Sequence, residues 1–283
     1  MRNFTVSLLL TVLVTGSTAL GIGFIGTPTS KLEKGQVGIG FDYSYSSVNP
    51  AASSMSRQHE LSTFWNDKPL KSFSWEDSYK LNLDDLNVSR YYGVISYGVL
   101  DFWDVDLKLG MADVKGDSAT PLFSAGHNFD NEFAIGWGTR LTFYEKDNIA
   151  WGFTAQMNWL NTDWGRSRPL CKDHAAYTRD IKLKTYDLVL AVGPTIDFGG
   201  WRLYGGPYYY YLYGDIKEVR TLSTSLGRLS TLTTSSASGN VSADGFGGFL
   251  GVEVDLFKNT SLSCEASMMN RGWALGASVV YRF

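Results

Sequence analysis

The chain has 283 residues, of which 44% are hydrophobic, enough to form a folded core and to exclude a disordered chain. Its 25 Lys and Arg nearly balance its 28 Asp and Glu, and the basic residues form no stripe, so nucleic acid is not an expected partner. Beyond the N-terminal segment, no apolar run approaches the ~18–20 residues that a membrane-spanning helix needs, which excludes helical membrane proteins.

The N-terminus has the pattern of an export signal. Arg2 supplies a positive charge, residues 4–14 form a short apolar stretch, and small residues follow up to Ala19. This order predicts a signal peptide over residues 1–19 that is cleaved after Ala19. The mature chain, residues 20–283, is then a single exported domain.

Period-two alternation dominates the rest of the chain and predicts β-strands. It is clearest at the C-terminus, where apolar residues occupy every second position from Trp273 to Phe283. The same reading along the chain predicts strands at 36–46, 86–97, 102–112, 132–144, 149–160, 180–192, 200–212, 244–256, 260–269 and 273–283. Each is about the length that a tilted strand needs to cross a bilayer.

The connections between these strands alternate in length. Those at 98–101, 145–148, 193–199 and 257–259 are short, whereas those at 47–85, 113–131, 161–179 and 213–243 are long and polar. Short periplasmic turns and long external loops are typical of an up-and-down outer-membrane barrel. The sequence therefore predicts an all-β fold, a single antiparallel transmembrane β-barrel of about ten strands, with an uncertainty of two strands.

Aromatic residues separate this fold from a soluble β-sandwich. Trp103, Trp151 and Trp201 fall near short turns, and Trp159 and Trp273 fall near long loops. Two aromatic girdles around an apolar band are typical of a membrane barrel, whereas a sandwich buries its aromatics in mid-strand. The run of four tyrosines at 208–211 is interpreted as a strand that crosses the upper girdle, with its inward rings packed in the lumen.

The last strand resembles the assembly signal of bacterial outer-membrane β-barrel proteins of the small OmpA-type class. Phe283 is the terminal aromatic, Tyr281 stands two residues before it, and Gly276 and Ser278 lie on the other face, with Ser278 where the pattern usually has Gly. The resemblance implies location in the outer membrane of a diderm bacterium. It also implies contact with outer-membrane lipid and with the barrel-assembly machinery through the C-terminal strand.

The strand faces opposite the apolar ones carry charges of both signs, which predicts a charge network that fills the lumen. Its expected members are Asp42, Arg90, Asp104, Asp106, Lys108, Arg140, Asp187, Arg202, Glu253, Asp255, Glu265 and Arg282. Buried charges persist only when they are paired, and about ten strands leave an interior that side chains nearly fill. A narrow pore for ions or small solutes is the alternative, because inward glycines such as Gly152 and Gly276 leave room for a water-lined path.

An enzyme is a weaker interpretation. The Asp84-Asp85 and Asp173-His174 pairs have the residue types of an omptin-like protease, but adjacent strand residues face opposite ways, so Asp84 and Asp85 do not converge. Lipid-modifying barrels use a Ser–His arrangement, and the three histidines, His59, His127 and His174, all fall in predicted solvated loops. The sequence shows no metal-ligand cluster and implies no cofactor.

The long connections at 47–85 and 213–243 are the expected sites for an external ligand. The first contains several aromatic residues among charged ones. It either extends the barrel, plugs it or forms a binding surface. The second is rich in Ser and Thr and is typical of a mobile polar loop. Cys171 and Cys264 are not expected to pair, because Cys264 falls on a lipid-facing position and Cys171 in a distant loop. We expect a structural or surface-interaction protein with a charge-filled lumen.

Overall fold

A computed structural model describes the backbone of residues 23–49, 53–120, 123–171, 175–270 and 272–283. It describes their side chains except those at 48, 53, 81–86, 116–120, 123–132, 162, 164–171 and 175. The signal peptide predicted for residues 1–19 lies outside the described residues. The strands are β1 (Val37–Val48), β2 (Ser53–Trp65), β3 (Lys68–Leu100), β4 (Trp103–Thr120), β5 (Phe123–Lys146), β6 (Ile149–Cys171), β7 (Ala175–Asp197), β8 (Trp201–Leu226), β9 (Leu229–Phe257), β10 (Thr260–Met269) and β11 (Gly272–Arg282).

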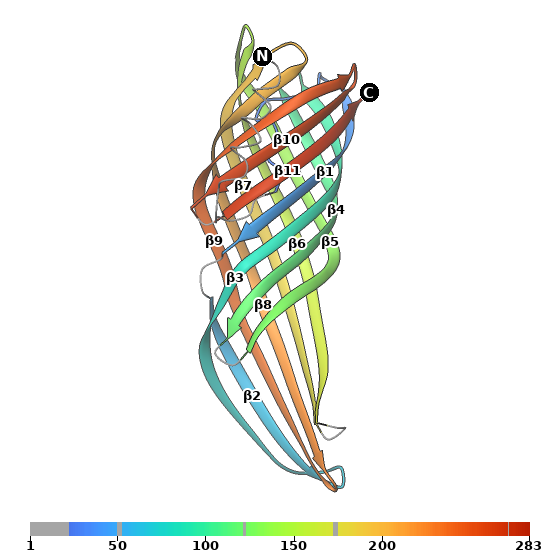
Figure 1. Ribbon diagram of the computed structural model, residues 1–283, viewed down its shortest axis with the longest axis vertical. Helices are drawn as coiled ribbons and strands as arrows, with labels where there is room; N and C mark the ends of the chain where they lie inside the picture. The colour runs from blue at the N-terminus through green and yellow to red at the C-terminus, as the bar shows by residue number, and fades with distance from the viewer. Residues whose placement is uncertain (1–22, 50–52, 121–122, 172–174, 271) are drawn as a thin grey trace, which may run out of the picture.

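These strands close into an antiparallel barrel (Figure 1). Near the chain termini, the described strands form a ring in the order β1, β3, β4, β5, β6, β7, β8, β9, β10, β11, and β1 pairs with β11 to close it. This ring confirms the prediction of about ten transmembrane strands, and each predicted strand coincides with part of one observed strand. By the usual orientation of such barrels, the short turns face the periplasm.

The wall is built differently in the half away from the termini. There β2 pairs with β3 on one side and with β9 on the other, so it stands in the place that β1, β10 and β11 occupy near the termini. The ladder between β5 and β6 ends at the Ala134–Leu160 pair in the described residues, whereas β6 and β7 stay paired up to Cys171 and Ala175. The extracellular half is therefore a continuation of the barrel wall by long hairpins.

The long connections are not irregular loops, and this is a correction to the sequence interpretation. β8 and β9 run as paired strands to a turn between Leu226 and Leu229, so the Ser- and Thr-rich segment predicted as a mobile loop is regular sheet. The segment 53–85 forms the β2–β3 hairpin, which is the barrel extension that the sequence offered as one of three alternatives. Thr and Ser pair well across strands, and the outward face of these hairpins needs no apolar residues because it lies in water.

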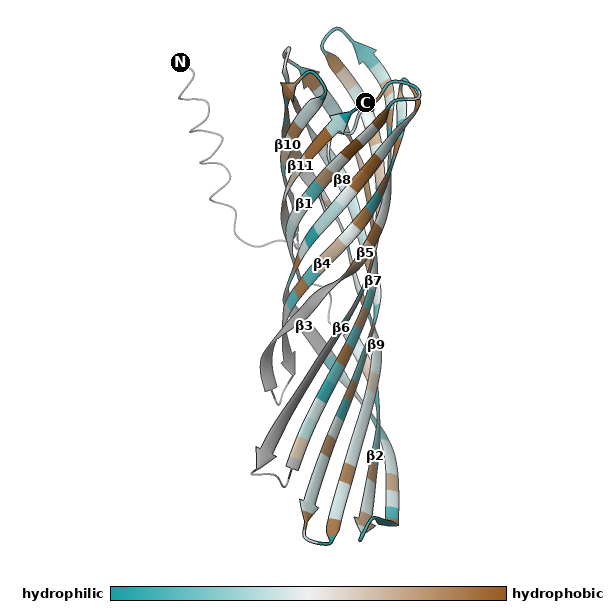
Figure 2. Cartoon of the chain, turned by 90° about the vertical axis from the view of Figure 1, so that its right-hand side faces the viewer, coloured by the Kyte–Doolittle hydropathy of each residue, from teal (hydrophilic) through white to brown (hydrophobic). Residues whose placement is uncertain are grey.

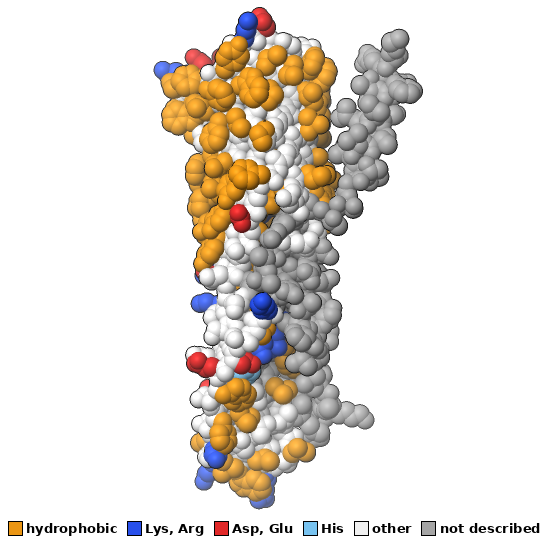
Figure 3. Space-filling model, turned by 90° about the vertical axis from the view of Figure 1, so that its left-hand side faces the viewer, with side chains coloured by type: hydrophobic (Ala, Val, Ile, Leu, Met, Phe, Trp, Pro, Cys, Tyr) orange, Lys and Arg blue, Asp and Glu red, His pale blue; other side chains and the backbone are white. Residues whose placement is uncertain are grey.

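The outer surface has an apolar band near the termini and a polar region beyond it (Figures 2 and 3). Large hydrophobic side chains in the band are exposed, among them Ile95, Leu107 and Trp137 at 51%, 44% and 41% of their area. Exposure of this kind is costly in water and favourable in lipid, so the band marks the bilayer. Among the described residues, no helix is long and apolar enough to cross a membrane.

The girdle expectation is confirmed where side chains are described, and so is the lipid-facing position expected for Cys264; the side chain of Cys171 lies outside the description. Trp103, Trp151 and Trp201 are exposed near the short turns, and Trp159 is exposed near the other edge of the band. In the tyrosine run, Tyr208 and Tyr210 are buried in the lumen, as expected for the inward face. Cys264 is free and exposed.

Candidate functional site

The candidate functional site is the lumen at membrane level, where the predicted charged residues converge. Nine of the twelve are buried: Asp42, Arg90, Asp104, Asp106, Lys108, Arg140, Asp187, Glu253 and Glu265. The other three, Arg202, Asp255 and Arg282, lie nearer the periplasmic rim and are partly exposed. Period two places all twelve on the inner face, because the strands that carry them present apolar side chains to lipid.

One charge cluster surrounds Arg140 on β5. Its Nε donates to Asp104 at 2.8 Å and its Nη2 donates to Asp106 at 2.6 Å, both on the neighbouring strand β4. Asp106 also accepts the hydroxyl of Ser96. Two carboxylates on one guanidinium satisfy the charge that burial would otherwise leave uncompensated.

A second cluster surrounds Arg202 on β8. Its guanidinium forms ion pairs with Glu253 at 2.7 Å, with Asp197 at 3.2 Å and with Asp255 at 3.3 Å. Arg282 on the last strand joins through Asp255 at 2.9 Å. At the periplasmic turn, the N–H of Gly199 and the adjacent Arg202 lower the pKa of Asp197. The cluster thus ties β7, β8, β9 and β11 together.

Two further ion pairs lie in the middle of the lumen. Arg90 on β3 meets Asp187 on β7 at 2.7 Å, and these strands lie on different sides of the ring. Lys108 on β4 meets Asp42 on β1 at 3.2 Å, with only β3 between the two strands. The pair that crosses the lumen, together with the rings of Tyr208 and Tyr210, leaves little open cross-section at this level.

Sequence reasoning missed the chain segment that lies inside this lumen, residues 23–32. Phe24 and Ile25 are buried, and the N–H groups of Ile25 and Gly26 donate to the two oxygens of Glu265 at 2.9 and 2.8 Å. Gln156 donates to the carbonyl of Ile25. Nearer the periplasmic end, the hydroxyl of Thr29 donates to the hydroxyl of Thr195 at 3.0 Å.

Lys31 in this segment joins the two charge clusters. Its N–H donates to Asp104 at 2.7 Å, and its Nζ forms an ion pair with Glu253. The sequence predicted that Asp104 and Arg140 belong to the same charge network as Arg202, Asp255 and Arg282. In the structure they form two clusters, and the link between them is Lys31, which no pattern in the strands indicated.

The inward glycines make room for this segment. A Cβ on Gly152 would lie 2.3 Å from the carbonyl oxygen of Pro28, and one on Gly276 would lie 2.7 Å from the ring of Phe24. The expectation that these glycines leave a water-lined path is therefore wrong at both positions, because protein occupies the space. The run of Gly, Pro and Ser between the predicted signal and the first strand was the available signal for such a segment.

A charged cluster that the sequence did not indicate lies inside the extracellular half. Glu218 on β8 pairs with Arg179 on β7 and with Arg220 at 2.7 Å, and it accepts the hydroxyl of Tyr79 at 2.8 Å. Burial acts to raise the pKa of Glu218, but the hydrogen bond from Arg220 and the charges of both arginines outweigh it and lower that pKa. Burial and the neighbouring Glu218 raise the pKa of Tyr79.

The structure gives the catalytic candidates no assembled site among its described side chains. Asp173 and His174 lie outside the described residues, and the side chains of Asp84, Asp85 and His127 are outside the description as well. His59 is not in a solvated loop as expected. It lies on β2 with 14% of its side chain exposed, stacked on Trp75 with ring centroids 4.6 Å apart and 3.3 Å from Asp77. Within the described residues no group of side chains is arranged to hold a metal ion.

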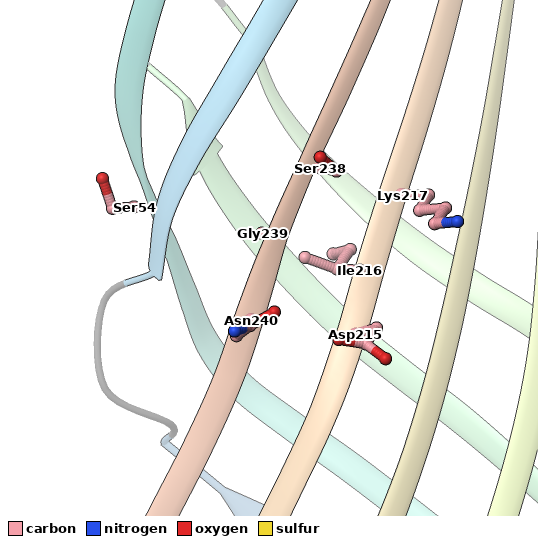
Figure 4. A pocket seen from close by; sticks show the side chains of 7 residues that line it. All are labelled: Ser54, Asp215, Ile216, Lys217, Ser238, Gly239 and Asn240. Carbon is pink, nitrogen blue, oxygen red and sulfur yellow. The ribbon is translucent and has the colours of Figure 1, made fainter.

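The extracellular wall also has a shallow outer hollow of about 650 Å³, where β9 changes its partner from β10 to β2 (Figure 4). Its lining is mostly polar and comes from three strands: Ser54, Asp215, Ile216, Lys217, Ser238, Gly239 and Asn240. The hollow is a consequence of the change from one wall arrangement to the other.

The residues predicted as the assembly signal lie on β11, which pairs with β1 to close the barrel. Ser278 is opposite Asp42, and Gly276 is opposite Ser44. The Tyr281 and Phe283 rings make an edge contact with centroids 4.8 Å apart on the lipid-facing surface. Their role in assembly stays a prediction.

Comparisons with known proteins place the chain in no family: no family model matches it, and no curated protein matches it. Solved structures with similar architecture include the outer membrane protease OmpT from Escherichia coli, at 9% identity and a TM-score of 0.42, covering 87% of this chain and 97% of that one. The translocator domain of autotransporter NalP from Neisseria meningitidis has 11% identity and a TM-score of 0.43, covering 100% and 95%. The Ail protein of Yersinia pestis has 13% identity and a TM-score of 0.27, covering 88% and 99%.

Similarity this low adds nothing to the argument, which rests on the geometry. A closed antiparallel ring, an exposed apolar band and two aromatic girdles around a polar interior are the features of a bacterial outer-membrane β-barrel. The chain is therefore an outer-membrane β-barrel protein of a diderm bacterium.

Proposed function

We propose that this barrel is a non-conducting, non-enzymatic protein that anchors a rigid extracellular extension for structural support or surface interaction. The observation that carries the proposal is the segment 23–32 inside the lumen. Its main chain is hydrogen-bonded to Glu265 and Asp104, and Lys31 pairs with Glu253, so it is bound to the wall at several heights. A lumen occupied in this way supports closure.

The extracellular half supports a role at the surface. β2, β8 and β9 extend to the far end of the molecule (Figure 1), and the N–H of Asn66 donates to the carbonyl of Arg228 at 2.9 Å, so the two hairpin turns are joined. This joined end exposes Trp65 and Leu226 at 49% and 77% of their area, beside Lys68. Exposed apolar side chains far from the bilayer favour contact with a partner, and they support an external ligand at the hairpin turns within segments 47–85 and 213–243.

Single-channel recording tests closure, and attachment of bacteria that display the protein tests the surface role. The narrow pore is the alternative, and steady current through the wild-type chain would favour it. The double variant Trp65→Ser, Leu226→Ser should insert normally and reduce attachment of displaying bacteria to cell and solid surfaces. Attachment equal to that of the wild type would count against the hairpin ends as the contact surface.

A further inference from the structure

The outer wall has a groove where β5 separates from β6. Because the β5–β6 ladder ends at Ala134 and Leu160 while β6, β7 and β8 continue side by side, the wall is interrupted at this point. The groove has a volume of about 360 Å³. Phe133 and Trp159 at its edge are exposed at 64% and 39% of their area, so it opens outward, away from the lumen.

Apolar side chains line the part of the groove nearest the membrane, in one row across four strands. Ile135 is opposite Trp159, Trp159 is opposite Tyr186, and Tyr186 is opposite Tyr213. The rings of Tyr186 and Tyr213 touch with centroids 5.6 Å apart. A row of Trp and Tyr on the outward face marks the boundary between the apolar band and water. This part of the groove therefore faces the outer leaflet of the membrane.

The next outward row, two residues further from the membrane, is polar. It consists of Asn161, Lys184 and Asp215, which are register partners on β6, β7 and β8 and line the same groove. One row further from the membrane, Lys182 is opposite Lys217. Lys182 also forms an ion pair with Asp163 at 3.0 Å. The groove thus changes from aromatic to cationic and hydrogen-bonding within a single step along the strands.

We propose that this groove binds a phosphorylated glycolipid of the outer leaflet. The acyl chains lie against Phe133, Trp159 and Tyr186, and Lys184 meets a phosphate at the level of the headgroup. The surrounding medium at this height is lipid, so the occupant of an outward apolar groove is an amphiphile, and cations at the membrane boundary attract anionic headgroups.

Asp215 distinguishes a sugar headgroup from a simple phospholipid headgroup. A carboxylate beside Lys184 repels phosphate, but it accepts hydrogen bonds from hydroxyl groups, and the Asn161 amide both donates and accepts them. A sugar that carries hydroxyls together with a phosphate satisfies all three side chains at once. A bare phosphate headgroup, as in phosphatidic acid, carries no alcohol hydroxyl and leaves Asp215 without a donor.

Lipid binding to the intact protein in zwitterionic detergent, measured by native mass spectrometry, tests the proposal. The probes are a diphosphorylated glucosamine-disaccharide lipid, its dephosphorylated form and phosphatidic acid, which has a phosphate but no alcohol hydroxyl. We expect the diphosphorylated glycolipid to bind most tightly. Equal binding of its dephosphorylated form would overturn the role of Lys184, and equal binding of phosphatidic acid would overturn the sugar assignment.

Two variants and one control locate the site. Lys184→Glu should weaken binding of the diphosphorylated glycolipid about tenfold, because it removes a cation from the headgroup level and puts an anion in its place. Phe133→Ser should weaken the binding of all three lipids. Lys146→Glu makes the same charge change at an exposed periplasmic turn and should leave binding unchanged. Heat-dependent gel mobility verifies folding of each variant, and equal effects of Lys184→Glu and Lys146→Glu would overturn the site.

Discussion

The carboxylate of Glu265 accepts the N–H of Ile25 at 2.9 Å, across 240 residues of sequence. Its second oxygen accepts the N–H of Gly26 at 2.8 Å, so one wall residue holds two consecutive peptide groups of the lumen segment. Buried peptide groups need partners wherever they lie, and Glu265 supplies them where no neighbouring strand is available. The segment is thereby part of the folded interior.

Replacing Glu265 with Ala should lower the free energy of unfolding by about 2–3 kcal/mol, because it leaves two buried N–H groups without an acceptor. Urea denaturation of the detergent-folded protein measures this change. Glu145→Ala removes a carboxylate from an exposed turn and serves as the control, with no expected change in the midpoint. Equal midpoints for the two variants would show that the contact to Ile25 and Gly26 contributes nothing.

Replacing Arg202 with Met should lower the free energy of unfolding by about 2 kcal/mol, because it leaves the buried Glu253 with fewer cationic partners. The value is below that for a fully buried pair because 23% of the Arg202 side chain is exposed. Lys182→Met breaks only the surface pair with Asp163 and should change stability by less than about 0.5 kcal/mol. A wild-type midpoint in Arg202→Met would contradict a stabilising cluster.

Glu218 predicts how the stability of the extracellular half depends on pH. Its pKa in the folded protein is lowered, so its contribution is fully present above the unfolded pKa of about 4.3 and is lost as pH falls through the folded pKa. The difference in stability between the wild type and Glu218→Gln should be constant from pH 8 to about 5 and should shrink below about 4. If the stability difference between the wild type and Glu218→Gln instead grew as the pH fell, the pKa of Glu218 in the folded protein could not be lowered.

Much of the fold was predictable because strand alternation encodes which face meets lipid. Asp104, Arg140 and Glu253 were placed inward by parity alone, whereas their individual partners were not predicted, because strand parity does not say which inward charges meet. Lys31 was not predictable, because it belongs to a segment without periodicity whose position is set by contacts with distant strands. Glu218 was missed for a related reason, since polar composition in 213–243 indicated a loop although β8 and β9 pair there. Tyr79 lies in 47–85, for which the sequence left three arrangements open.

The most direct test of a closed lumen is single-channel current from the refolded mature chain in a planar bilayer, with insertion verified by heat-dependent gel mobility. We expect no steady current from the wild type. Gly152→Val should open a path, because its side chain takes the space of Pro28, whereas Gly93→Val, on the exposed outer face, should not. Steady wild-type current that changes when Arg140 or Glu253 is neutralised would contradict the account and identify a selective pore.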